Sequence, residues 1–154
     1  MSSRISRREW ITAALCAGPA WAARPQGTLV ESHVHLFGDD LARFPYANAT
    51  SRRKPYTVED FLAFVNQAKI DHAVIVHPEP YQDDHRYLEY CLERAPAKGF
   101  FKASCLFDPI DPHTPHRMGE LVKRNPGAIS ALRIHEVHQP GTPPPRRDRY
   151  ATAT

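Results

Sequence analysis

Hydrophobic and polar residues follow two different periods along most of the chain. Four short runs rich in apolar residues predict β-strands, because each is bounded by polar residues, glycine or proline. These runs cover residues 28–34, 73–76, 99–109 and 128–137. Between them lie three segments in which apolar residues recur every three or four positions, which predicts amphipathic helices. The predicted order of elements is therefore β-α-β-α-β-α-β.

The three predicted helices also have recognisable starts. Thr57 is a good N-cap, Asp83 or Asp84 can cap the second helix, and Thr114 precedes a proline in the first turn of the third. The side chains expected to face the core are Val58, Phe61, Leu62, Val65, Ala68, Leu88, Cys91, Leu92, Ala95, Met118, Leu121 and Val122.

The apolar runs indicate strands that are buried on both faces, which is typical of a parallel sheet covered by helices. Both a doubly wound sheet and a (β/α) barrel fit this pattern. No glycine-rich loop follows the first strand, which disfavours the dinucleotide-binding form of the doubly wound fold. The segment 38–55 predicts a loop of a length that usually serves a function.

The two ends of the chain differ in composition from the part between them. Residues 1–22 have a basic head with Arg7 and Arg8, an apolar middle and a final Ala20-Trp21-Ala22, which together resemble a twin-arginine export signal. An amphipathic N-terminal helix is the alternative. We therefore expect three parts: the signal (1–22), a β/α domain (23–140) and a disordered Pro/Arg tail (141–154).

Charge and cysteine content narrow the classes of function. The net charge of +3 comes from the two ends, since residues 23–145 hold 14 basic and 15 acidic groups. This balance argues against a nucleic-acid-binding protein. Cys16 lacks the upstream leucine of a lipoprotein signal, so we expect no stable membrane anchor. Cys91 and Cys105 lie in apolar segments and are expected to be buried thiols, rather than a disulfide or a nucleophile.

The first predicted strand ends in the sequence HVH, in which His33 and His35 share one face of the strand. Active sites of parallel α/β folds lie at the C-terminal ends of the strands. Two imidazoles at this edge predict a site for a divalent metal ion. In a chain with nine histidines, however, one such pair can also arise by chance.

Other polar residues follow the remaining strands. His77 ends the second strand, Asp108 the third, and Arg133 and His135 lie on one face of the fourth. Each has a structural alternative: His77 can simply end a strand, and Asp108 before Pro109 is a common turn former. Arg133 in an apolar strand indicates an anionic partner. The other histidines after the signal are expected at the surface, namely His72, His85, His113, His116 and His138.

Four stretches together resemble the amidohydrolase-related family of metal-dependent (β/α)8-barrel hydrolases. They are ESHVHLFG, DHAVIVHPEPYQDDHRYLEYCLE, GFFKASCLFDPIDP and ISALRIHE, in the same order and spacing over about residues 28–140. The resemblance implies that these β/α units form the first half of a TIM-like barrel. It also implies that His33 and His35 bind the metal ion, and that Arg133 and His135 contact the substrate. From its place at the end of the second strand, we expect His77 to contact the substrate too.

The resemblance implies hydrolysis of a C–O or C–N bond, in a lactone or an amide, with zinc as the expected ion. Some lactonases of this family keep the histidine pair but use no metal, and the family also includes decarboxylases, so both remain alternatives. The family's general-base aspartate and a further histidine come from later strands than this sequence holds. We therefore expect a truncated, incomplete barrel, for which an inactive fragment is the alternative. The export signal implies a bacterial periplasmic or secreted protein that uses the twin-arginine machinery. The resemblance to hydrolases implies a small-molecule substrate.

Overall fold

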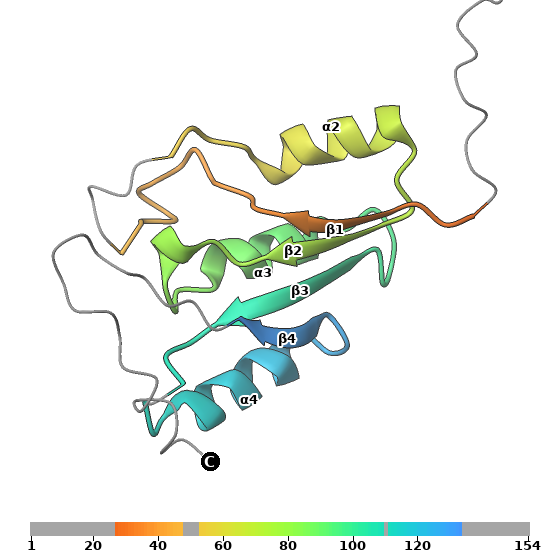
Figure 1. Cartoon of the computed structure of the whole chain (residues 1–154). Helices are drawn as coiled ribbons and strands as arrows, with labels where there is room; N and C mark the ends of the chain where they lie inside the picture. Colours follow the sequence, from red (N-terminus) through yellow and green to blue (C-terminus); the bar gives the residue numbers. More distant parts are fainter. Residues whose placement is uncertain (1–26, 48–52, 110, 134–154) are drawn as a thin grey trace, which may run out of the picture.

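The computed structural model describes residues 27–47, 53–109 and 111–133. Its elements follow the predicted order of alternating strands and helices (Figure 1). The strands are β1 (Val30–Val34), β2 (His72–Val76), β3 (Phe101–Leu106) and β4 (Ile129–Arg133). The helices are α2 (Val58–Ala68), α3 (Arg86–Glu93) and α4 (Thr114–Arg124), with one 3-10 turn, η1 (Glu79–Tyr81).

The four strands form one parallel sheet in the order β1-β2-β3-β4. Each strand thus pairs with the next one in the chain, and a helix connects each pair. A β/α barrel is built in this way, whereas a doubly wound sheet reverses its strand order at a switch point. The predicted parallel β/α fold of barrel type is therefore confirmed for the described residues.

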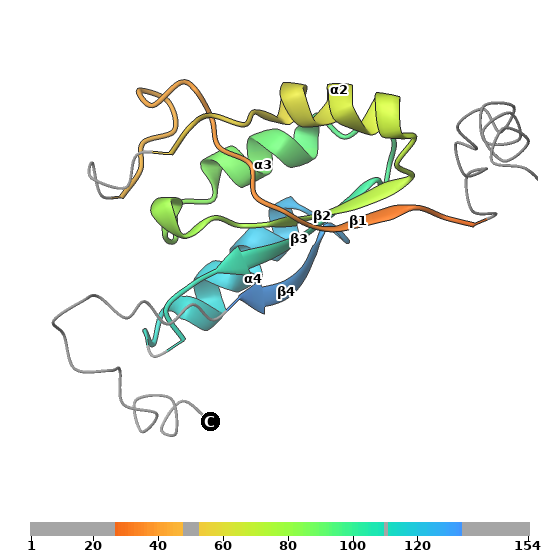
Figure 2. The same ribbon diagram turned by 45° about the horizontal axis from the view of Figure 1, so that its top comes forward.

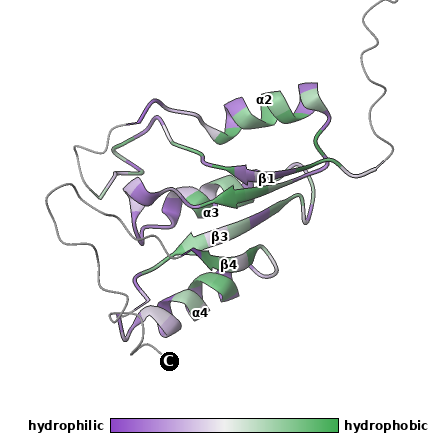
Figure 3. Ribbon diagram, viewed as in Figure 1, coloured by the Kyte–Doolittle hydropathy of each residue, from purple (hydrophilic) through white to green (hydrophobic). Residues whose placement is uncertain are grey.

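The three helices lie on one side of the sheet in both views (Figures 1 and 2). Alternate strand residues point toward them, as Ala73, Ile75, Ala103 and Cys105 show, since each is almost completely buried. The intervening residues of the strands point to the opposite side, which we call the inner face. In Figure 3 β2 is mostly hydrophobic, while the segment that follows it is largely hydrophilic.

Helix α2 starts at the residue that the sequence indicates. The Thr57 side chain accepts a hydrogen bond from the Asp60 amide, and the Asp60 side chain accepts one from the Thr57 amide, which forms a capping box. Val58, Phe61 and Val65 are buried against the sheet, as predicted. The helix ends at Lys69 in the left-handed conformation.

The loop after β1 is fixed by tyrosines of the next β/α connection. The Tyr81 hydroxyl accepts a hydrogen bond from the Gly38 amide at 2.9 Å, and the Tyr87 hydroxyl accepts one from the Val58 amide at 3.2 Å. Both rings are buried. A Cβ on Gly38 would lie 3.0 Å from the Tyr87 ring, so any larger residue there would press against this buried ring.

Three local predictions need correction or comment. The N-cap of α3 is His85, with no side-chain cap, although Asp84 accepts a hydrogen bond from the Arg86 amide. Val122 was expected to face the core but is 39% exposed, and the buried residues of α4 are Thr114 and Leu121.

Cys91 and Cys105 are buried free thiols, as expected. Within the described ranges, no helix is both long and apolar enough to cross a membrane.

Candidate metal and substrate site

His33 and His35 point to the inner face of the sheet, because Val34 and Leu36 between and after them are buried in the core. Their Nε2 atoms lie 3.1 Å apart and their rings meet edge to face. The Nδ1 atom of His35 lies 2.7 Å from the carbonyl oxygen of Val76 on β2. A ring that donates Nδ1–H to a carbonyl keeps the lone pair of Nε2 for a metal ion.

This pair fits two neighbouring positions in the coordination shell of a divalent metal ion. Two imidazoles at zinc–nitrogen distances of about 2.0–2.1 Å in a tetrahedron place their nitrogens about 3.3 Å apart, close to the 3.1 Å observed. Among residues 27–47, 53–109 and 111–133, no group of three or more His, Cys, Asp or Glu side chains could hold a metal ion. The described residues thus supply two of the ligands that such a site needs.

Arg133 approaches the same end of β2 from the other side. Its Nη1 donates a hydrogen bond of 2.9 Å to the carbonyl oxygen of His77. Val76 and His77 are adjacent, so His35 and Arg133 bind consecutive carbonyls of one short stretch of backbone. These two carbonyls point toward opposite neighbouring strands, because the His77 amide bonds to Ser104 of β3.

The ring of His77 does not reach the inner face in this structure. It is fully buried, and its Nε2 donates to the carbonyl oxygen of Gln82 at 2.9 Å. Burial, with the adjacent His85, lowers the pKa of His77 to about 3, so the ring is neutral. The backbone carbonyl of His77 thus contacts Arg133. Its side chain instead bonds to Gln82, in the connection between β2 and α3.

His85 is not at the surface, and that prediction is wrong. It is 6% exposed, lies between the rings of His77 and Phe107, and accepts a hydrogen bond from the Leu106 amide. Burial lowers the pKa of His85 as well. A position at the start of a helix looks solvated in sequence, and only the packing of α3 on β3 buries it. His72, His113 and His116 are exposed, as expected.

Several predicted features lie outside the described residues. They include His135, which was expected to share a face with Arg133, and His138. The export signal (1–22) and the Pro/Arg tail (141–154) lie there too.

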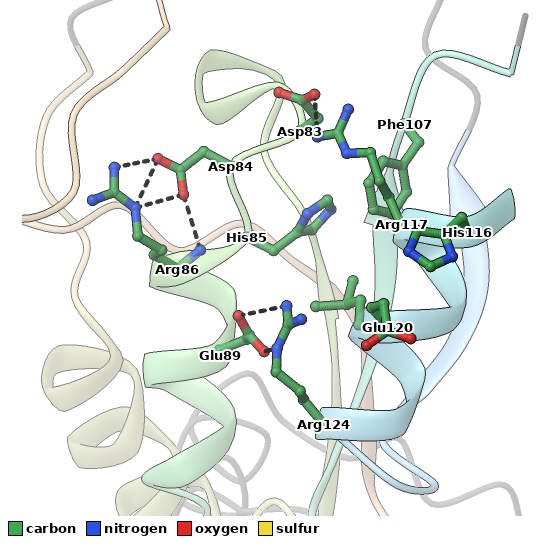
Figure 4. Close-up of a pocket in the computed structure, with 11 residues that line it drawn as sticks. Asp83, Asp84, His85, Arg86, Glu89, Phe107, His116, Arg117, Glu120 and Arg124 are labelled. Carbon is green, nitrogen blue, oxygen red and sulfur yellow. Dashed lines mark hydrogen bonds and ion pairs between the residues drawn. The ribbon is translucent and has the colours of Figure 1, made fainter. Parts of the chain in front are cut away.

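A separate cleft of about 380 Å³ opens between the start of α3 and α4 (Figure 4). It lies on the helix side of the sheet, since Phe107 and Leu121 of the core line it. Its charged side chains are paired with each other, as Arg117 with Asp83 and Arg124 with Glu89 show. Burial works to raise the pKa of Glu89, but hydrogen bonds from Arg124 and Asn125 outweigh it and the pKa is lowered. The cleft is therefore a salt-bridged seam between helices, distinct from the histidine pair.

Comparison with known proteins relates the chain to lactone hydrolases. It is 31% identical over 90 residues to 4-sulfomuconolactone hydrolase of Rhizobium radiobacter, an alignment that covers 52% of this chain and 28% of the relative. No family model matches the sequence.

Two solved structures share the fold. A probable 2-pyrone-4,6-dicarboxylic acid hydrolase of Acinetobacter baumannii with citric acid bound matches with a TM-score of 0.54 and 15% identity, over 70% of this chain and 38% of that one. A putative 2-pyrone-4,6-dicarboxylic acid hydrolase of Pseudomonas putida matches with a TM-score of 0.50 and 21% identity, over 70% and 36%. The chain therefore spans between a quarter and two fifths of the length of these proteins.

Proposed function

We propose that this chain carries part of the active site of a metal-assisted hydrolase of the amidohydrolase-related family, which opens the ring of a small carboxylated lactone. The observation that carries the proposal is the convergence of the His33 and His35 Nε2 atoms to 3.1 Å at the end of β1. The similarity to 4-sulfomuconolactone hydrolase supports the choice of a lactone as the substrate.

In this proposal His33 and His35 hold a divalent ion, for which zinc is the best candidate because imidazole nitrogens suit it. When bound, the ion supplies Lewis-acid polarisation of the lactone carbonyl and a water of lowered pKa. The hydrogen bond from His35 to the Val76 carbonyl fixes the ring orientation and leaves Nε2 unprotonated. It thereby sets the direction from which the ion is held.

Arg133 binds the substrate carboxylate. A guanidinium has five donors in a planar fork that matches a carboxylate, and charge-assisted bonds of this kind are about twice as strong as neutral ones. Arg133 is half-buried on the inner face, where its Nη1 contacts a neutral backbone carbonyl. It thus lies at the same edge of the sheet as the imidazoles and can orient an anionic substrate toward them. In this proposal His135 assists Arg133.

The experiment measures, by isothermal titration, binding of carboxylated lactones and of matched lactones that lack the carboxylate to the purified, zinc-loaded chain. We expect the carboxylated series alone to bind, and a rise in Kd of at least tenfold in Arg133→Gln. Arg86→Gln is the control, since Arg86 is an exposed arginine paired with Asp84 on α3. Absence of binding with every carboxylated lactone and metal tested would refute the proposal.

We further propose that the protein is exported to the bacterial periplasm or beyond through the twin-arginine machinery. The basic head, the apolar stretch and the Ala20-x-Ala22 pattern support this. Mass spectrometry of the protein from its host tests it: cleavage near residue 22 is expected, and an intact N-terminus in the cytoplasm would refute it.

A further inference from the structure

Ser104 on β3 is a buried polar residue for which the described part of the chain offers no hydrogen-bond partner. The residue is 8% exposed, and its hydroxyl oxygen is buried and unpaired. Its neighbours Ala103 and Cys105 are fully buried on the helix side. By alternation, the Ser104 side chain points to the inner face, as the histidine pair does. A buried hydroxyl without a partner destabilises a fold, so its presence calls for an explanation.

Ser104 lies between the two parts of the candidate site. Val34 pairs with Ile75, which places His35 beside Val76, and Val76 pairs with Ser104. His35, Val76 and Ser104 therefore form one row across the inner face of three adjacent strands. Arg133 pairs with Leu106, one inner-face position beyond Ser104.

The side chain of Arg133 crosses β3 close to this position. It starts on β4 beside Leu106 and reaches the His77 carbonyl that follows β2, and β3 lies between these two strands. Leu106 and Ser104 are both buried although they face away from the helices. The guanidinium of Arg133 therefore lies at the same end of β3 as the Ser104 hydroxyl.

We propose that Ser104 forms the floor of the substrate site, where its hydroxyl donates a hydrogen bond to a carboxylate oxygen of the substrate that Arg133 binds from above. This inference rests on the proposed lactone hydrolase function. When the carboxylate enters, Arg133 exchanges the neutral His77 carbonyl for the anion, because the charge-assisted bond is the stronger one. Ser104 is then a binding residue that selects substrates with an acceptor close to the sheet.

The test compares Ser104→Ala with Ser130→Ala in the full chain loaded with zinc. Ser130 is the matched control, since its hydroxyl already donates to the Ala103 carbonyl. Isothermal titration with a carboxylated lactone and thermal unfolding are measured for each variant. We expect Ser104→Ala to raise the Kd of the lactone at least tenfold, with no loss of thermal stability. Ser130→Ala should keep the Kd within twofold of the unaltered chain.

The outcomes separate this inference from the proposed function. An unchanged Kd in Ser104→Ala, with an unaltered chain that binds the lactone, would overturn the role of Ser104 and leave the proposed function standing. A higher Kd that accompanies a lower unfolding temperature in Ser104→Ala would also overturn it, because the hydroxyl would then be structural. An unaltered chain that binds no carboxylated lactone would overturn the proposed function, and the role of Ser104 with it.

Discussion

The Nδ1 atom of His35 lies 2.7 Å from the carbonyl oxygen of Val76, and this contact joins β1 to the end of β2. It fixes the ring so that Nε2 points at the Nε2 of His33, 3.1 Å away. The next carbonyl in the chain, that of His77 directly after β2, accepts a hydrogen bond from Arg133. The end of β2 is therefore the common support of the imidazole pair and the guanidinium.

Replacement of either imidazole should weaken metal binding. His33→Asn or His35→Asn removes one of the two converging nitrogens. Loss of a hydrogen-bond partner of a metal ligand lowers metal affinity roughly 10–100-fold, and loss of the ligand itself should lower it further. Isothermal titration with Zn²⁺ measures the affinity. His116→Asn, at an exposed histidine on α4, is the control and should bind zinc as the unaltered chain does. Equal affinity in all three variants would show that zinc binds elsewhere.

The stability of the fold should fall in acid because of its buried histidines. His77 has a pKa of about 3 in the folded chain against 6.5 when unfolded, and the pKa of His85 is lowered too. Between pH 3 and pH 6.5 the unfolded state binds more protons than the folded state. The free energy of unfolding therefore falls as the pH falls from about 6.5 toward 3. One such group contributes at most about 1.4 kcal/mol per pH unit.

His77→Gln should make this pH dependence shallower by up to one proton, while His85 keeps its share. Urea unfolding at several pH values between 4 and 7 measures the slope. The charged neighbours Asp84 and Arg133 act on His77 in opposite directions, so they alter the slope little. An unchanged slope in the variant would show that His77 is not the group that titrates.

The capping box of α2 should contribute to stability independently of the site. Thr57→Ala removes the acceptor for the Asp60 amide and should lower the free energy of unfolding by about 1 kcal/mol. Thr57→Ser keeps the hydroxyl and should cost much less. Chemical denaturation of both variants checks this, and equal losses would assign the effect to the methyl group instead.

The two cysteines should be inert in the folded protein. Cys91 is fully buried, and burial raises the pKa of its thiol and of the Cys105 thiol. A thiol reagent should therefore label neither Cys91 nor Cys105 in native buffer, and both in denaturant. Rapid labelling of the native protein would contradict the buried positions. Mass spectrometry of peptides distinguishes these thiols from Cys16.

The fold was predictable because its signals are local. Apolar runs, the Thr57 cap and helical spacing define the elements, and parallel strands joined by helices follow from them. The shared face of His33 and His35 follows from strand alternation alone.

Other features depend on contacts between distant segments, and no local pattern carries them. His85 is buried only because α3 packs on β3, and the Tyr81 hydroxyl meets Gly38 across 43 positions in sequence. Gln82 adopts a φ of 51°, which a sequence would assign to glycine. The link from Arg133 to the His77 carbonyl spans 56 positions, so the support that β2 gives to both site groups could not be inferred from sequence.

X-ray absorption at the zinc edge of the metal-loaded chain tests the central claim most directly, because it reports the atoms bound to the ion. The geometry of His33 and His35 predicts at least two imidazole nitrogens at about 2.0–2.1 Å from zinc, with the scattering pattern of intact rings. In His35→Asn the imidazole signal should fall by one ring. A spectrum without imidazole scattering, or one that His35→Asn leaves unchanged, would contradict a metal site at the end of β1.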